Sequence, residues 1–329
     1  VLAGAIGNGG IINIEAASLS LTNGGELRVS VNQAFDTLAG GQGNGSTINI
    51  NVRDVLNISG TDNSGIFANL GTGATGRGGD IKVQAGNLSI KDNGEISSTT
   101  SGKGDSGKIS ITIRDAISLD TGGIYSNVQS RDAVGNAGSI DVTTGSLSLT
   151  SGAQINSFTR GQGNAGNITI QALDRVSLDG FDTNNNYSAL SSNVLAGAIG
   201  NGGIINLEAG SLSLTNGGKL RVSVNQAFDT LAGGQGIGGT INVNVRDALN
   251  ISGTDNSGLF ADIGAGAIGR GGNINIQAGN LSIKDNGQIS SATSGKGDSG
   301  KISITARDAI SLDTGSIFSN VQSRDAVGN

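Results

Sequence analysis

The chain repeats itself at two lengths, and these repeats limit its possible folds more than any other feature of the sequence. Residues 1–136 return as residues 194–329 with 116 of 136 positions identical, so the long period is 193 residues. Within it a unit of 28–37 residues recurs, marked by small residues before an I-x-[IVL] segment. A unit this short cannot bury a core alone, so its copies are expected to stack on one another.

Each short unit has the pattern of three β-strands. In the third unit, Ile81 and Val83 alternate with polar residues, Leu88 and Ile90 do the same, and Ile96 follows an Asp-Asn-Gly turn. A period of two residues indicates strands, and Asn-Gly pairs indicate tight turns between them. Helical periodicity is absent from the sequence.

The simplest fold that satisfies both repeats is all-β, a right-handed parallel β-helix (β-solenoid) of about ten three-strand coils. We expect one continuous solenoid over residues 1–329, with a complete long repeat at 1–193 and a partial second copy at 194–329. Ten coils at ~4.8 Å would make a rod of roughly 50 Å. The chain opens and closes within repeated text, so the sequence predicts a fragment of a longer rod.

Three columns of aliphatic side chains are predicted to stack inside the rod. The first is Ile12, Ile48, Ile81, Ile109, Ile140, Ile168, Ile205, Ile241, Ile274 and Ile302. The second begins with Leu19, Leu56, Leu88, Ile117, Leu147 and Val176. The third begins with Leu27, Ile66, Ile96, Ile124 and Ile155.

The first corner of the unit is one residue longer in every second unit, and an Arg-Asp pair marks most of these longer corners. The extra residue predicts a β-bulge or a wider bend, with the charged pair pointing to solvent. The pairs are Arg53-Asp54, Arg114-Asp115, Arg246-Asp247 and Arg307-Asp308.

One segment, GKGDSGKIS at residues 102–110, has the glycine and lysine spacing of a phosphate-binding loop. Ile109, however, occupies the position of the hydroxyl residue, and a strand-like segment follows where the motif needs a helix. The segment also recurs in the second copy, and the six G-x-G-x-x-G matches in the chain likewise precede no helix. We therefore interpret the segment as a turn between coils, with Lys108 solvated and no nucleotide bound.

Composition excludes several classes of function. The chain has no histidine and no cysteine, so Ser-His-Asp and Cys-His catalysis, ordinary zinc sites and disulfides are impossible. Its net charge of −6 and pI near 4.7 argue against a nucleic-acid partner. No apolar run approaches the ~20 residues of a membrane helix, so we expect no membrane insertion by this segment. The sequence predicts no catalytic, cofactor-binding or metal-binding residues.

Several phrases resemble the repeats of a known family. They are GGDIKVQAGNLSI at 78–90, AGSIDVTTGSLSLTSGAQINS at 137–157 and GNAGNITIQALDRVSLDG at 163–180. They look like the repeats of filamentous-haemagglutinin-type exoproteins, in particular the large ones common in cyanobacteria. The resemblance implies export by a two-partner secretion system and display or release as a long β-helical rod. It supplies no functional residues.

These observations favour a structural or adhesive protein of the extracellular cell surface that forms an elongated rod or filament. Its expected partners are its own copies, joined end to end or laterally, or extracellular glycans and cell surfaces. We expect no enzymatic activity and no cofactor.

Two other functions remain open alternatives. A polysaccharide-active β-helical enzyme would need a unique carboxylate cluster, yet the aspartates recur as repeat positions: Asp105, Asp120 and Asp132 return as Asp298, Asp313 and Asp325. A calcium-stabilised surface-layer component could use loop oxygens, and the candidates are Asp62-Asn63, Asp92-Asn93 and Asp182. The glycine-rich repeat of calcium β-rolls is missing.

Overall fold

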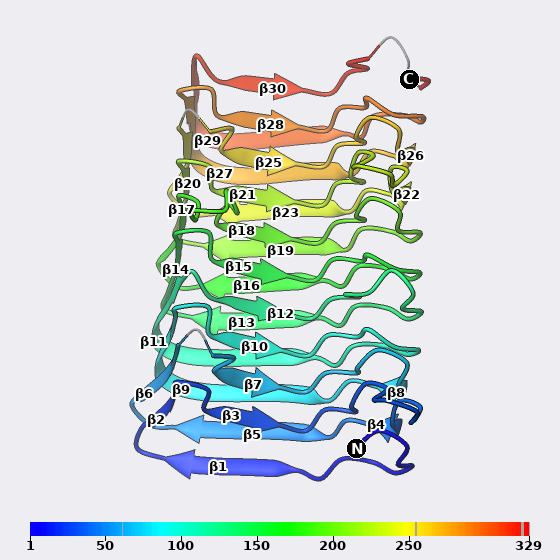
Figure 1. Cartoon of the computed structure of the whole chain (residues 1–329). Coiled ribbons are helices and arrows are strands. Elements are labelled where there is room, and N and C mark those ends of the chain that lie inside the picture. Colours follow the sequence, from blue (N-terminus) through cyan, green and yellow to red (C-terminus); the bar gives the residue numbers. More distant parts are fainter. Residues whose placement is uncertain (61, 254, 324–325, 329) are drawn as a thin grey trace.

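The computed structural model describes residues 1–329 except 61, 254, 324–325 and 329. The described residues form thirty β-strands and no helix. Successive coils wind upward as a right-handed solenoid, and every strand pairs in parallel with the same strand of the next coil (Figure 1). The predicted fold class is therefore confirmed.

The first and second strands of the coils form one sixteen-stranded sheet that bends at the first corner. Four of its members, each twelve residues long, run through that corner, so two predicted strands are continuous there. The strands that begin the coils are β1 (Ile12–Ala16), β5 (Thr47–Val52), β9 (Asp80–Lys91), β11 (Ile109–Asp120), β13 (Ile140–Thr144), β16 (Ile168–Ala172), β19 (Ile204–Ala209), β23 (Thr240–Val245), β27 (Asn273–Lys284) and β29 (Ile302–Asp313). The separate second strands are β2 (Leu19–Thr22), β6 (Val55–Ser59), β14 (Ser146–Thr150), β17 (Arg175–Asp179), β20 (Ser211–Thr215) and β24 (Ala248–Ser252).

The third strands form a ten-stranded sheet along the face turned toward the viewer in Figure 1. They are β3 (Glu26–Arg28), β7 (Gly65–Phe67), β10 (Glu95–Ser97), β12 (Gly123–Tyr125), β15 (Gln154–Asn156), β18 (Ala189–Ser191), β21 (Lys219–Arg221), β25 (Gly258–Phe260), β28 (Gln288–Ser290) and β30 (Ser316–Phe318). The long loops after them add two short pairs that sequence did not predict. These are β4 (Gln42–Asn44) with β8 (Thr75–Arg77), and β22 (Gln235–Ile237) with β26 (Ile268–Arg270).

The core consists of stacked aliphatic columns. The register places the ten isoleucines of the first column opposite one another in successive coils. The second and third columns are in register in the same way. Inside the rod these side chains are fully buried, as at Ile81 and Ile109, whereas Ile12 and Ile302 in the first and last coils are partly exposed. Each fully buried aliphatic side chain contributes about 1.5–3 kcal/mol.

The GKGDSGKIS segment is a turn between coils, and a buried serine explains its glycine. The Ser98 hydroxyl donates to the Gly79 carbonyl oxygen (2.7 Å) and accepts from the Gly107 N–H (2.9 Å). A Cβ on Gly107 would collide with that same carbonyl oxygen, so only glycine fits. Ser126 repeats the arrangement one coil later. Lys108 lies at the surface in an ion pair with Asp141 (2.7 Å), as a turn residue and not as a phosphate ligand.

The Arg-Asp corners are exposed and contain the expected irregularity. The pairing of β9 with β11 shifts register between Ile113 and Ala116, and Arg114 bonds Asp115 across 3.0 Å in solvent. The pairs at 53–54 and 307–308 have the same geometry. Arg246 differs, because its guanidinium donates to the Leu173 carbonyl oxygen (3.1 Å), two coils earlier.

Candidate functional site

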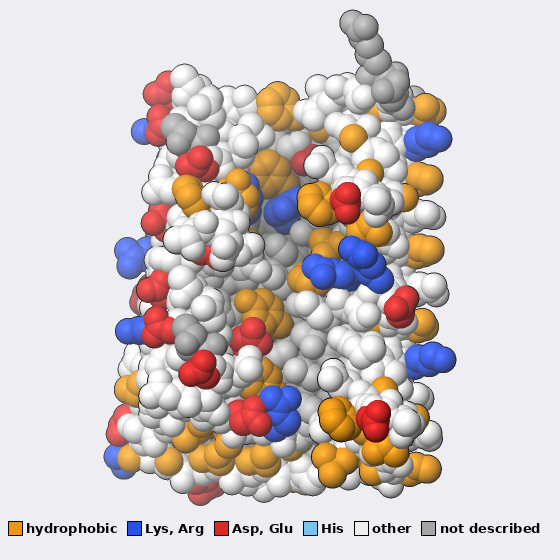
Figure 2. Space-filling model, viewed as in Figure 1, with side chains coloured by type: hydrophobic (Ala, Val, Ile, Leu, Met, Phe, Trp, Pro, Cys, Tyr) orange, Lys and Arg blue, Asp and Glu red, His pale blue; other side chains and the backbone are white. Residues whose placement is uncertain are grey.

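The outer face of the third-strand sheet is the floor of a groove that runs along the rod. Figure 2 shows this groove as a hollowed band containing hydrophobic and charged side chains between two raised banks. Side chains alternate along each strand, so the middle residue of each third strand points into the core and its neighbours point into the groove. The loops after the third strands, longest at 29–46 and 222–239, make one bank.

Four of the five alternate coils place a small residue and an aromatic ring on the groove floor, and the exception is β18, which ends in Ser191. The strongest examples are Gly65 with Phe67, Gly123 with Tyr125, and Gly258 with Phe260. The Tyr125 ring lies directly over Gly123, where any Cβ would collide with it. The glycine therefore leaves room for the aromatic ring two positions later in the same strand to lie flat along the sheet.

The middle part of the groove has a volume of about 420 Å³, with Asn69, Glu95, Tyr125, Gln154, Asn156 and Phe158 among its lining residues. We call it the Glu95 groove. Glu95 is in register with Gly65 on one side and Gly123 on the other, so the two rings that cover these glycines flank it. Among the described residues, no ion pair or hydrogen bond engages its carboxylate. Burial raises the pKa of Glu95, and burial together with the charge of Glu95 raises the pKa of Tyr125.

Asn156 supplies an unused acceptor on the floor of the Glu95 groove. The side chain is only 4% exposed, and its Nδ2 donates to Gln154 Oε1 (2.6 Å). Its Oδ1 has no hydrogen-bond partner within the described part of the chain. Leaving such a buried acceptor unpaired costs about 1–3 kcal/mol, so this atom is available for a ligand donor.

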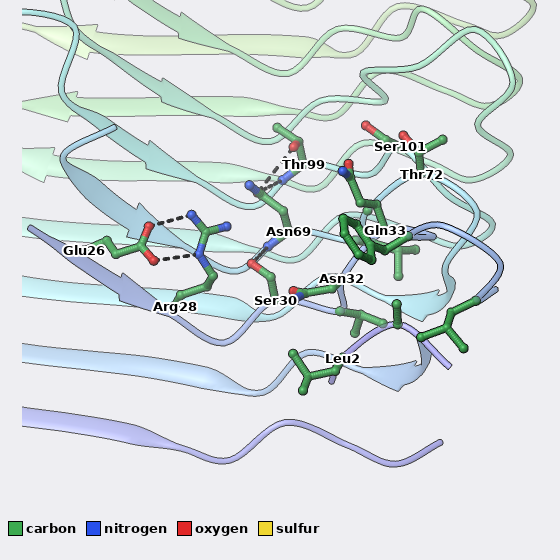
Figure 3. Close-up of a pocket in the computed structure, with 16 residues that line it drawn as sticks. Leu2, Glu26, Arg28, Ser30, Asn32, Gln33, Asn69, Thr72, Thr99 and Ser101 are labelled. Carbon is green, nitrogen blue, oxygen red and sulfur yellow. Dashed lines mark hydrogen bonds and ion pairs between the residues drawn. The ribbon is translucent and has the colours of Figure 1, made fainter. Parts of the chain in front are cut away.

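Upstream, in the first three coils, the groove widens to about 900 Å³ (Figure 3). Arg28 binds Glu26 with two hydrogen bonds (2.6 and 3.1 Å), which lower the pKa of Glu26, and its guanidinium lies 4.8 Å from the centre of the Phe67 ring. Asn69 Oδ1 accepts from the Thr99 N–H (2.8 Å), and this bond ties neighbouring coils together. Arg28 is neutralised locally, so this part of the groove carries no free cation.

The same position in the second repeat has the opposite charge, because Lys219 replaces Glu26. The Lys219 ammonium lies 3.2 Å from the centre of the Tyr187 ring and 5.9 Å from that of Phe260. Burial, with the nearby positive charge of Arg221, lowers the pKa of Lys219 to about 8. Burial also lowers the pKa of Arg221.

Asp262 accompanies this change in charge, since it replaces the Asn69 of the first repeat. Its Oδ1 accepts from Ser290 Oγ (2.6 Å) and from the Ala292 N–H (2.8 Å), so it keeps the structural bonds that the asparagine makes. Burial raises the pKa of Asp262. The second repeat therefore replaces the anion Glu26 with the cation Lys219, keeps the arginine and adds the anion Asp262.

Some of the differences between the two copies change the side chains of this groove. Twenty of the 136 aligned positions differ, and seven of them lie on the groove floor or banks. The seven are Glu26/Lys219, Asn69/Asp262, Thr72/Ala265, Glu95/Gln288, Thr99/Ala292, Gly123/Ser316 and Tyr125/Phe318. Sequence analysis missed the groove, although a small residue two positions before Phe or Tyr at the third strand of alternate units was its visible signal.

The other sequence-predicted positions have local structural roles. Asn63, Asp92 and Asn93 have positive φ and form turns. The Asp182 carboxylate accepts from the backbone N–H groups of Asn184 and Asn186 (both 2.8 Å). Among the described residues no group of three or more His, Cys, Asp or Glu is placed to hold a metal ion.

Of the recurring aspartates, Asp105 accepts from the Asn136 N–H (2.7 Å) in the loop of the next coil, and Asp325 lies outside the described residues. Within the described ranges, no helix has the length and apolar character needed to span a membrane.

Fold and groove together define a β-solenoid that presents a long mixed aromatic and polar trough on one face. Comparison with protein-family models, with curated proteins and with solved structures finds no match to this chain.

Proposed function

We propose that the chain is a segment of an extracellular surface rod, of the filamentous-haemagglutinin type that its repeats resemble, with a structural and adhesive role. The observation that carries this proposal is the unbroken stack of ten coils with aligned core columns. In such a stack each coil contacts only its neighbours, so duplicating whole coils lengthens the rod without disturbing the core. The 193-residue repeat has the character of such a duplication.

The rod acts by binding and not by catalysis in this proposal. Its partners are further copies of the chain or extracellular glycans and cell surfaces. The groove supports a binding role, because it is an outward-facing surface whose side chains differ between two otherwise similar copies. Residues that differ on a shared scaffold are suited to recognition of different ligands.

Electron microscopy of intact cells labelled with an antibody to this segment tests the location. We expect label on fibres, spikes or a coat outside the outer membrane. Label confined to the cell interior would contradict the proposal. Incubation of the purified chain with extracellular polysaccharides tests whether the rod binds or cleaves them. An enzyme would generate new polysaccharide chain ends, and a binding protein would not.

A further inference from the structure

We propose that the Glu95 groove binds an uncharged, hydroxyl-rich saccharide chain lying along the rod. The inference deepens the proposed function, on which it rests, by assigning a ligand class and a site to the adhesive surface. It is argued from the unpaired polar atoms of the groove, its aromatic rings and its local charge.

The hydrogen-bonding groups of the Glu95 groove match those of a saccharide. The groove offers two acceptors without partners among the described residues, the Glu95 carboxylate and Asn156 Oδ1. Beside them lie the amides of Gln154 and Asn127, which both donate and accept. A sugar hydroxyl can donate to an unpaired acceptor and accept from a neighbouring amide at the same time. A chain of hydroxyls therefore satisfies both kinds of group, and the cost of the buried Asn156 oxygen is recovered on binding.

The aromatic side chains of the groove also favour a saccharide. Tyr125 and Phe158 both line the groove, and both remain partly exposed. The apolar faces of sugar rings pack against such surfaces while their edges keep polar contacts. Phe67 and Tyr125 stand two coils apart, so their rings lie ~10 Å from each other along the axis. An extended ligand fits this open trough better than a single sugar.

The local charge of the groove favours an uncharged ligand. Glu95 is negative, and Arg160, which stacks on Phe158 at 5.8 Å, is positive at the rim. The two balance across the groove, so an uncharged ligand matches it. A uronate or sulfated chain would place its anionic groups against the half-buried Glu95 carboxylate, and this repulsion would weaken binding.

The second repeat shows which substitutions the coil accepts at the positions to be tested. Gln288 occupies the position of Glu95 in an otherwise similar coil, so Glu95→Gln is expected to fold normally. Lys82→Asn is the matched control, because Asn275 occupies that position in the second copy and Lys82 is exposed on the other sheet. Both variants change one charge, and only the first lies in the groove.

The test is isothermal titration of the full chain with three hexasaccharides: a neutral β-linked glucose oligomer, a galacturonate oligomer and a glucosamine oligomer. We expect the neutral oligomer to bind, and the galacturonate to bind about tenfold more weakly or not at all. Glu95→Gln and Asn156→Leu should each weaken the neutral ligand about tenfold, and Tyr125→Ala by more. Lys82→Asn should bind as the parent does.

Three results would overturn the inference. They are galacturonate binding as tight as the neutral oligomer, binding of the glucosamine oligomer alone, and unchanged neutral binding in folded Glu95→Gln. If the antibody labels rods at the cell surface but the chain binds no saccharide, the proposed saccharide site is refuted and the proposed function still stands. Saccharide binding that Glu95→Gln weakens, in a protein labelled only inside cells, would keep the site and refute the proposed function.

Discussion

Arg28 and Arg221 occupy the same position in two copies of one repeat, but their surroundings differ in charge. Arg28 is held by Glu26 in a bidentate ion pair, whereas Arg221 has the Lys219 ammonium as its strand neighbour. Backbone pairing and core columns are the same in both copies. The comparison shows that the solenoid leaves the chemistry of its groove free to change.

The interior also changes between the copies, but each changed position of the main core cluster keeps an apolar side chain. Where core residues differ, one aliphatic side chain usually replaces another of similar volume, as in Ile50/Val243 and Ile66/Leu259. A stacked column tolerates such exchanges because its total volume is nearly kept. Groove side chains face solvent or a ligand, so the packing of the rod does not restrict their charge.

The largest expected effect concerns the shared core. Ile109→Asp buries a carboxylate between Ile81 and Ile140 and should lower the free energy of unfolding by several kcal/mol. The equivalent Ile302→Asp lies in the last coil, where the side chain is partly exposed, and should cost much less. Thermal melting followed by circular dichroism measures both variants. Equal effects, or none at Ile109, would contradict the stacked column.

The next prediction converts one groove into the other. Lys219→Glu should let Arg221 form the ion pair that Arg28 makes and should remove a buried ammonium, so we expect stabilisation of about 1 kcal/mol at pH 7. The reverse change, Glu26→Lys, should destabilise. Denaturant unfolding of the parent and of both variants measures these changes in the free energy of unfolding.

The Lys219→Glu exchange should also change how the stability of the protein depends on pH. The folded-state pKa of Lys219, about 8, lies below the ordinary value of 10.5, so between these pH values the unfolded chain binds more protons. The contribution of Lys219 to stability therefore rises with pH across this window, and Lys219→Glu should remove that rise. Parallel pH profiles for parent and variant would contradict the buried ammonium.

A smaller effect is expected at positions that the two copies share. Thr100 and its counterpart Thr293 are buried in a column with Val128 and Ile263, and neither hydroxyl has a hydrogen-bond partner among the described residues. Replacement by valine keeps the shape and removes the unpaired hydroxyl, so each variant should gain about 1 kcal/mol. Unequal gains in the two copies would show that their interiors differ after all.

The smallest effect is expected at the turn that resembles a phosphate loop. Lys108→Ala removes an exposed ion pair with Asp141 and should change the free energy of unfolding by less than about 0.5 kcal/mol. Nucleotide titration should show no binding to parent or variant. Binding to the parent that disappears in Lys108→Ala would revive the phosphate-loop interpretation.

The coil, its three strands and the side chains that fill its core can all be predicted from the amino-acid sequence. Period-two alternation assigns each side chain to the inside or the outside, and the repeat aligns equivalent residues such as Ile81 and Ile109 in neighbouring coils. These features are local or periodic, so they can be read from the order of residues.

The outer surface of the rod, in contrast, depends on how the coils are assembled in three dimensions. Glu95, Tyr125 and Asn156 are about thirty residues apart in sequence and become neighbours because successive coils stack in register. Among the described residues, Glu26 has a partner and Asn156 Oδ1 has none, and this difference depends on how several coils and their loops cover one another. Outward side chains follow no packing period, and so their chemistry emerges only from the assembled surface.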